Sequence, residues 1–398
     1  MYTISFFSQN CKVLIDTSNK IVYNRKTNFR REGAFVISVI FDRRQLHQIP
    51  ELDRQLPETL AYLTAALEGL GCTLSSPIVG SLCAWFDFGR EKAIAFRADM
   101  DALPIGEKTG APYASRHPGR MHACGHDGHM AIALELARRL SKRKQLSRNI
   151  LLVFQPAEEA SGGAKDICDT GIFERYQVEA IFGLHLWPGL EKGKLFSKPG
   201  PMMSRSSELD VDFYGKSAHI GRSWEGIDAM EAACVYLHRA YELERSVPAD
   251  IPRLLKFGWM ESGTVRNAIS AHTRLEGGLR AFSDEVYFGL RDRLLEIARE
   301  VEARFGCTVK VHTSNGYPAI DNPKPLHDRV RAIAPFEALA EPSMTTEDFS
   351  WYQRYLPGMF FFLGLGENPA LHSDNFDFDE SVLTVGADFF EKIAEGWT

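Results

Sequence analysis

The chain has 398 residues, more than a single hydrophobic core usually organises, so we expect two domains. Its 46 Lys and Arg against 52 Asp and Glu give a formal net charge of -6, which disfavours the concentrated basic surface that nucleic-acid backbones require. No apolar run approaches the length of a bilayer span, so the composition argues against nucleic-acid and membrane partners and favours a small-molecule substrate.

The cysteine pattern and the first residues indicate a cytoplasmic protein. Seven cysteines are scattered singly, without a CxxC pair, which is typical of a reduced compartment. Residues 1–36 are basic and lack the apolar core of a signal peptide. We therefore expect them to be an N-terminal extension outside the fold and a candidate mobile segment.

The first half of the chain alternates helical and strand patterns. Residues Pro57–Leu70 and Met130–Leu140 carry apolar residues at helical spacing, whereas Ala93–Phe96, Asn149–Phe154 and Ala180–Leu186 are short apolar runs typical of buried strands. Strands that alternate with helices predict an α/β catalytic domain with a mostly parallel central sheet.

A second unit is expected after Lys198–Ser204, a Pro- and Gly-rich segment with the composition of a linker. The periodicity that follows predicts a strand, a helix, two strands, a helix and a strand, at Glu208–Phe213, Ile227–Tyr241, Leu254–Met260, Arg274–Arg280, Val286–Val301 and Cys307–His312. This β-α-β-β-α-β order is that of a ferredoxin-like α+β unit. Because an apolar run and a helix follow it, we expect residues 201–314 to be inserted into a discontinuous catalytic domain, 37–200 and 315–398.

Residues suited to bind divalent metals follow several predicted strands. They are Asp99 and Asp101, Cys124 and His126, Glu158 and Glu159, and His185. Ligands of an α/β sheet collect at the carboxyl ends of its strands, so these side chains can reach one crevice. Imidazole, thiolate and carboxylate donors together suit zinc or a neighbouring transition metal. A hydrolase also needs a carboxylate that is free to move protons, and adjacent Glu158 and Glu159 offer one residue for each task.

The chain resembles a known family in several independent motifs. RADMDALP, MHACGHDGH, FQPAEE, GLHLWPG, YGKSAH, SGTVRNAIS and TTEDFSWY, in this order, are similar to motifs of the M20 metallopeptidase family, over roughly residues 37 to 398. Within that family they resemble the branch of amidohydrolases and N-acyl-amino-acid deacylases, with hippurate hydrolases, auxin-conjugate hydrolases and N-acetyl-diaminopimelate deacetylases. The resemblance implies a zinc-peptidase-like catalytic domain, with the inserted unit serving as a lid and dimerisation domain.

The resemblance also implies a role for each motif residue. Cys124 would bridge two divalent ions (Zn, Mn, Co or Ni), with His126 and His185 completing one site and Glu159 and His372 the other. Glu158 would be the general base and acid, and Asp101 an outer carboxylate that orients a ligand. On the inserted domain, His219 would reach across a homodimer to stabilise the oxyanion, while Asn267 and Arg280 would contact the substrate's carboxylate or the tetrahedral intermediate.

Two departures and several alternatives stay open. Asn267 is followed by Ala268–Ser270 instead of Val-Ile-Pro, and His219 by Ile220–Trp224 instead of the more frequent Pro-His, so the acyl group is not fixed. The residues alone also allow His185 as a core histidine, His219 as a cap and Arg280 as a surface ion pair. We expect hydrolysis of N-acyl amino acids. The alternatives are a dipeptidase or aminopeptidase of the same family, or a catalytically silent metal-binding or scaffolding relative.

Overall fold

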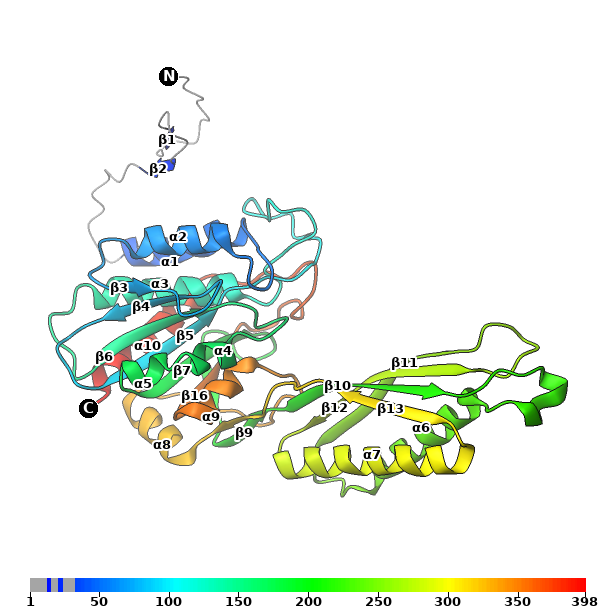
Figure 1. Ribbon diagram of the computed structural model, residues 1–398. Coiled ribbons are helices and arrows are strands. Elements are labelled where there is room, and N and C mark those ends of the chain that lie inside the picture. The colour runs from blue at the N-terminus through cyan, green and yellow to red at the C-terminus, as the bar shows by residue number, and fades with distance from the viewer. Residues whose placement is uncertain (1–12, 16–20, 24–32) are drawn as a thin grey trace.

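A computed structural model describes residues 13–15, 21–23 and 33–398 (Figure 1). Most of the predicted extension, residues 1–36, lies outside the described residues. Two short strands within it, β1 (Val13–Ile15) and β2 (Ile21–Tyr23), pair antiparallel. Among the described residues, no helix combines the length and the apolarity that a membrane span requires.

The larger part of the molecule is built on an eight-stranded sheet of order β15-β8-β16-β7-β5-β6-β4-β3. Its strands are β3 (Thr73–Ser75), β4 (Leu82–Phe86), β5 (Ala93–Asp99), β6 (Asn149–Gln155), β7 (Val178–Trp187), β8 (Leu195–Ser197), β15 (Glu337–Ala338) and β16 (Gly358–Gly364). The central neighbours β16, β7, β5 and β6 run parallel, while β3, β4 and the pairing of β8 with β16 are antiparallel. The prediction of a mainly parallel α/β sheet is confirmed.

Helices cover both faces of this sheet, which is why its central strands are buried throughout. One face packs against α1 (Gly33–His47), α2 (Pro57–Leu67), α3 (His126–Leu140), α8 (Lys324–Ile333) and α10 (Val382–Gly396). The other packs against α4 (Ala164–Asp169), α5 (Ile172–Arg175), the short 3-10 turn η2 (Asp348–Trp351) and α9 (Tyr352–Tyr355). Along β5, Ile94, Phe96 and Ala98 face the first core, while Ala95 faces the second, as strand alternation requires.

Helix α3 begins at His126, four residues before the predicted start at Met130. The residue before the helix, Gly125, has φ 86°, a left-handed conformation that favours glycine. A Cβ on Gly128 would lie 2.6 Å from Leu186 Cδ1, so this glycine lets the first turn of α3 approach β7 closely. Apolar periodicity did not indicate this start, because the first turn contains His126, Asp127 and His129, which are polar although they are buried.

A smaller unit carries its own core. Its antiparallel sheet has the order β11-β12-β10-β13, formed by β10 (Arg205–Tyr214), β11 (Arg253–Ser262), β12 (His272–Ala281) and β13 (Thr308–Thr313). Helices α6 (Ala229–Ser246) and α7 (Asp284–Phe305) pack on one face, and the turn η1 (Ile220–Glu225) follows β10. The chain order β-α-β-β-α-β agrees with the ferredoxin-like expectation. We call residues 205–313 the small unit, and the eight-stranded sheet with its helices the large unit.

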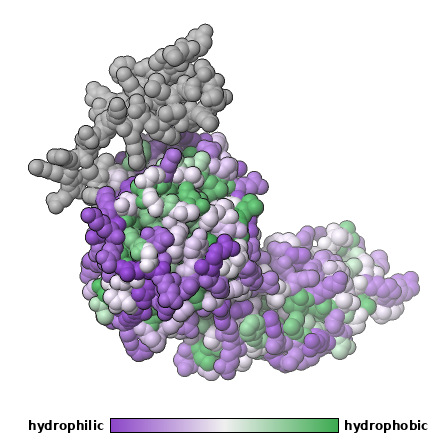
Figure 2. Space-filling model, turned by 60° about the vertical axis from the view of Figure 1, so that its left-hand side comes forward, coloured by the Kyte–Doolittle hydropathy of each residue, from purple (hydrophilic) through white to green (hydrophobic). Residues whose placement is uncertain are grey.

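The small unit projects from one side of the large unit (Figures 1 and 2). The predicted linker Lys198–Ser204 is partly a strand, because β9 (Gly200–Met203) pairs antiparallel with β14 (Ile320–Asn322). The segment that leads into the small unit is therefore hydrogen-bonded to the segment that leads back from it. The domain bounds 201–314 stay a prediction, and the strands of the small sheet span 205–313.

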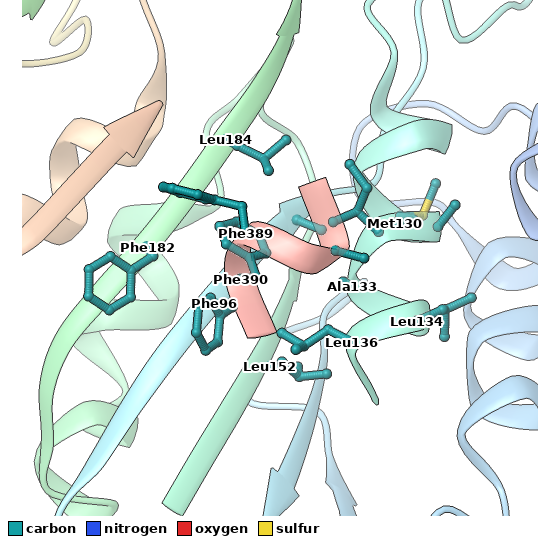
Figure 3. Packing of buried hydrophobic residues seen from close by; sticks show 14 of the residues in the cluster. Phe96, Met130, Ala133, Leu134, Leu136, Leu152, Phe182, Leu184, Phe389 and Phe390 are labelled. Carbon is teal, nitrogen blue, oxygen red and sulfur yellow. The ribbon is translucent and has the colours of Figure 1, made fainter. Parts of the chain in front are cut away.

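Phe96 lies at the centre of the larger core, fully buried, with ring centroids 5.6 Å from Phe182 and 4.8 Å from Phe390 (Figure 3). We predict that Phe96→Ala lowers the free energy of unfolding by about 3–5 kcal/mol, because truncation leaves a cavity between the sheet and α10. Phe41→Ala, at a ring that is 56% exposed, should change it by less than about 1 kcal/mol. Denaturant unfolding of both variants measures this, and equal losses would contradict it.

Candidate metal centre and active site

The predicted metal ligands converge at the carboxyl ends of β5, β6 and β7. These strands are parallel neighbours, so their following residues emerge at one edge of the sheet. Cys124 and His126 lie at the start of α3, Glu158 and Glu159 follow β6, and His185 lies near the end of β7. His372, distant in sequence, joins them from the loop after β16.

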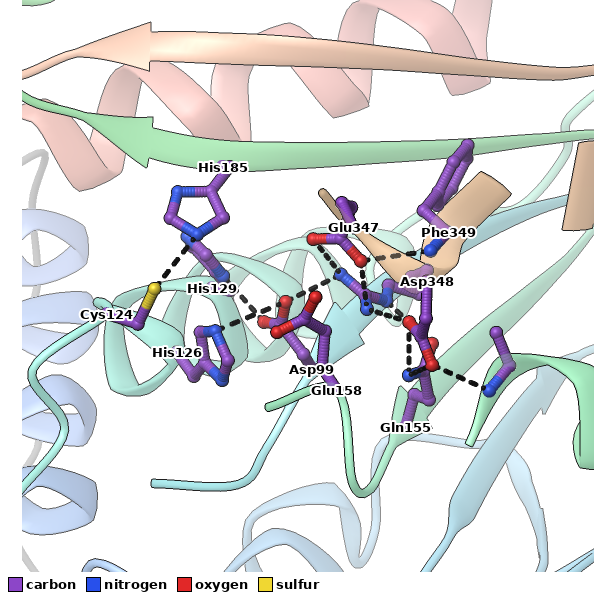
Figure 4. A network of polar contacts seen from close by, with 12 residues as sticks. Asp99, Cys124, His126, His129, Gln155, Glu158, His185, Glu347, Asp348 and Phe349 are labelled. Atoms are coloured by element: carbon purple, nitrogen blue, oxygen red, sulfur yellow. Dashed lines mark hydrogen bonds and ion pairs between the residues drawn. The ribbon is translucent and has the colours of Figure 1, made fainter. Parts of the chain in front are cut away.

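Two groups that share Cys124 hold their donor atoms close enough to bind a metal ion. In each group all ligand atoms lie within 4.8 Å of one another: Cys124, His126 and His185 in one, and Cys124, Glu159 and His372 in the other. A third set within the same distance consists of His126, Glu158 and Glu159. Cys124 Sγ is 3.4 Å from His185 Nε2, and His372 Nε2 is 3.2 Å from Glu159 Oε1 (Figure 4 shows the first pair). Cys124 belongs to both groups, as the predicted bridging role requires.

The histidine rings are oriented with Nε2 toward the site. His126 Nδ1 lies 2.7 Å from the Asp101 carbonyl oxygen, and His185 Nδ1 lies 2.7 Å from the Leu186 carbonyl oxygen. A carbonyl oxygen only accepts, so each Nδ1 carries the proton and each Nε2 keeps its lone pair. His126 Nε2 is buried without a hydrogen-bond partner among the described residues. Buried polar atoms are rarely left so, and a metal ion would satisfy this nitrogen.

The charges at the site favour bound cations. Burial raises the pKa of the Cys124 thiol well above its ordinary value, and the carboxylates of Glu159 and Glu158 raise it further. A thiolate at this position therefore needs positive charge beside it. Burial and the charge of Glu347 likewise raise the pKa of Glu158, which is only 7% exposed. The N, S and O donors fit a zinc-like divalent ion, so the residues present suit the predicted metals.

His129 and His122, which the sequence left unassigned, have different surroundings. His129 Nδ1 lies 2.6 Å from Asp99 Oδ1, while its Nε2 accepts a hydrogen bond from the Leu186 backbone N–H at 2.9 Å. Both ring nitrogens are thus used in supporting the structure. Both nitrogens of His122 are buried without a hydrogen-bond partner among the described residues, and burial lowers its pKa to about 3. His122 is therefore neutral.

Asp101 orients the two glutamates through their backbone. Its carboxylate accepts hydrogen bonds from the N–H groups of Glu158 (2.9 Å) and Glu159 (3.0 Å), and its carbonyl oxygen accepts from His126. The residue before Glu158, Ala157, has φ 65°, an uncommon conformation for a residue other than glycine. His372 has φ 64°. Strained backbone at two separate segments of the site indicates that the surrounding structure fixes them.

The network around Arg97 is the part of the site that sequence reasoning missed. Arg97 is buried at 2% exposure, and its guanidinium binds Asp99 at 2.6 Å, Glu347 at 2.8 Å and Asp348 at 2.9 Å. Figure 4 shows Asp99, Glu347 and Asp348 beside Glu158. The signal was visible as an arginine inside the apolar strand AIAFRAD, where a charge requires a partner.

Glu347 and Asp348, both in the motif TTEDFSWY, are therefore partners of Arg97. Asp348 also accepts hydrogen bonds from Gln155 and from the N–H groups of Gly163 and Ala164 at the start of α4. The Arg97 network thus links β5, β6, α4 and η2 below the metal ligands.

A cavity of about 1060 Å³ opens over the metal ligands between the two units. Its lining includes Cys124, Glu158, Glu159, His185 and His372 from the large unit and Arg280 from β12 of the small unit. Arg280 Nη1 donates to the Met344 carbonyl oxygen at 2.6 Å, so the arginine reaches across the units.

His219 and Asn267 lie elsewhere. Among the described residues that line this cavity, neither occurs, and both are exposed. The backbone segments that carry them contact each other instead. The Ile220 N–H donates to the Asn267 carbonyl oxygen at 3.0 Å, and His219 and Ala268 form an isolated antiparallel β-bridge. The structure therefore brings together the predicted ligands, Glu158, Asp101 and Arg280, but leaves this pair apart from the site of its own chain.

Comparisons with known proteins agree on one family. The model of peptidase family M20/M25/M40 matches residues 95–396. An N-acetyldiaminopimelate deacetylase of Lacticaseibacillus casei is 35% identical over 359 residues, covering 86% of this chain and 94% of the relative. A crystal structure of the Bacillus subtilis YXEP protein, described as a dinuclear metal binding peptidase from the M20 family, is 29% identical with TM-score 0.81, covering 91% and 98%. A Staphylococcus aureus structure, 26% identical, superposes with TM-score 0.86, covering 91% and 96%.

We predict that the chain, stripped of metal by a chelator and dialysed against Zn²⁺ or Mn²⁺, takes up two ions, one for each group of ligand atoms. His126→Ala should lose at least one of them, because it removes a buried donor that nothing else replaces. His238→Ala, an exposed histidine on α6, is the matched control and should bind as the wild type does. Metal analysis of the dialysed proteins measures the content. Full uptake by His126→Ala would contradict the assignment of this ligand.

Proposed function

Because the chain belongs to peptidase family M20/M25/M40, we propose that it is a metal-dependent amidohydrolase that removes the acyl group from N-acyl amino acids. The family match confirms the resemblance read from the motifs, and the chain is a hydrolase of amide bonds. The deacetylase named among its relatives supports an N-acyl amino acid as substrate. The observation that carries the proposal is Glu158, a buried carboxyl that lines the cavity beside the two groups that share Cys124 and belongs to neither of them.

The chain's own residues divide the work of hydrolysis. Divalent ions held by Cys124, His126, Glu159, His185 and His372 would polarise the scissile carbonyl and acidify a water molecule. Glu158 accepts the proton of the attacking water and returns it to the nitrogen of the leaving amine. The burial that raises its pKa lets the carboxyl hold that proton between the two transfers. Asp101 keeps the backbone of Glu158 in place.

Arg280 supports recognition of the amino-acid part of the substrate. Its guanidinium uses one N–H group on Met344, and the remaining N–H groups form the planar fork that a carboxylate prefers. It lines the same cavity as Glu158, so a substrate with its amide at the metal ligands can place its carboxylate toward the small unit. This favours N-acyl amino acids over simple amides.

We further propose a homodimer formed through the small unit, in which His219 and Asn267 serve the site of the second copy. Both are exposed and lie outside the cavity of their own chain. Strand β11 is an edge strand of the small sheet. Among the residues whose exposure the structure describes, most of the exposed large hydrophobic side chains belong to the small unit: Tyr214, Ile220, Trp224, Met230, Trp259, Met260 and Val265. Exposed apolar groups beside an unpaired strand edge favour association.

A substrate panel tests the activity. We expect the metal-loaded chain to hydrolyse N-acetyl, N-benzoyl or indoleacetyl amino acids faster than dipeptides, and Glu158→Gln to lower kcat/KM by at least about a hundredfold because no base remains. Glu91→Gln, at an exposed carboxyl before β5, should keep wild-type rates. Release of the free amino acid measures both. A preference for dipeptides would indicate a peptidase, and wild-type turnover by metal-loaded Glu158→Gln would refute the proposed base.

Mixed dimers test the shared site. Glu158→Gln and His219→Ala should each be poorly active, yet their heterodimer contains one complete site, so co-expression should restore up to about a quarter of wild-type activity. Co-expression of Glu158→Gln with His126→Ala gives no complete site in a heterodimer, since both changes disable the large unit of their own chain. Absence of restored activity in purified Glu158→Gln/His219→Ala heterodimers would rule out a trans role of His219.

A further inference from the structure

Tyr317 connects the loop that carries Glu158 to the small unit. It lies where the chain returns from β13 to the large unit, is half-buried and lines the cavity. Its hydroxyl donates to the Glu158 carbonyl oxygen at 3.0 Å and lies 3.4 Å from the Ala160 carbonyl oxygen. The ring covers the same loop, because a Cβ on Gly162 would lie 3.2 Å from Tyr317 Cε1.

The loop of residues 157–163 has an internal hydrogen bond from the Gly162 N–H to the Ala157 carbonyl oxygen at 2.8 Å, and further contacts hold it from outside. Asp101 accepts from the N–H groups of Glu158 and Glu159, and Asp348 accepts from those of Gly163 and of Ala164, the residue after the loop. On the carbonyl side, Glu158 O is held by Tyr317. Since Ala157 has φ 65°, the loop lies in a conformation that its own backbone does not favour. Loss of one hydrogen bond from outside the loop should therefore make the backbone that carries Glu158 more mobile.

The backbone of Tyr317 is fixed to the small unit. Its carbonyl oxygen accepts a hydrogen bond from the Ser206 N–H at 3.2 Å, at the start of β10. Gly316 lies against the same residue so closely that a Cβ would be 1.6 Å from Ser206 O. Ser206 is in turn the cross-strand partner of Arg280 on β12. One residue thus contacts both the strand paired with Arg280 and the loop of Glu158.

We propose that Tyr317 is a positioning residue for hydrolysis, whose hydroxyl fixes the Glu158 loop in register with the strands of the small unit that present Arg280. This inference rests on the proposed function for its kinetic part. The residue touches neither the reacting bond nor a metal ligand in this role. It acts by holding the backbone of the base where the substrate, anchored at the small unit, places its amide.

Tyr317→Phe tests this because it removes only the hydroxyl. We expect kcat to fall about tenfold, while KM changes less than about twofold, since base placement affects the transition state more than substrate binding. Hydrogen–deuterium exchange should become faster in peptides covering 157–163 and stay unchanged in the rest of the large unit. Tyr355→Phe is the matched control, because its exposed hydroxyl binds Asp169 at 2.5 Å outside the cavity, and it should keep wild-type kcat and exchange.

Each outcome decides the proposal. Wild-type kcat in Tyr317→Phe overturns it, and so does a fall in kcat without faster exchange at 157–163, because the hydroxyl would then act otherwise than by holding the loop. A rise in KM with unchanged kcat also contradicts it. If the metal-loaded wild type hydrolyses no member of the substrate panel, the proposed function fails, and the exchange experiment alone still shows whether Tyr317 holds the loop.

Discussion

The buried guanidinium of Arg97 is the interaction on which the site depends. Three carboxylates, from Asp99, Glu347 and Asp348, surround it in the interior. Without the cation these three carboxylates would repel one another beside a site that already contains Glu158 and Glu159, and removing one partner of such a buried network typically costs about 3–5 kcal/mol. Arg97 projects to the face of β5 opposite Phe96, toward α4 and η2, so it also joins segments that are 250 residues apart.

The active residues are held mainly by backbone groups and by carboxylates that contact no substrate. Asp101 binds the N–H groups of both glutamates, and backbone carbonyl oxygens fix the tautomers of His126 and His185. Such outer contacts keep ligand atoms close together although like charges repel. The Cys124 thiol and the Glu158 carboxyl then have raised pKa values, and bound cations would reverse that balance.

In the proposed function, the two units divide recognition from chemistry. The large unit supplies the metal ligands and Glu158, while Arg280 approaches from the small unit over the same cavity. The segments that join the units are held by the pairing of β9 with β14 and by Tyr317, so the distance between Arg280 and Glu158 is set by hydrogen-bonded backbone instead of a free linker. A substrate that spans this distance with an amide and a carboxylate is the one that the arrangement suits.

The sequence by itself determined the central strands, the order of the small unit, the family and the types of metal donor, because these depend on local periodicity and on motifs with fixed spacing. Tertiary structure alone decided what surrounds the donors. It assigned His129 to Asp99 and the Leu186 N–H, and gave Arg97 its three partners. It also started α3 at His126 and separated His219 and Asn267 from the cavity of their own chain. These facts arise from contacts between residues far apart in the chain, and local patterns carry no information on such contacts.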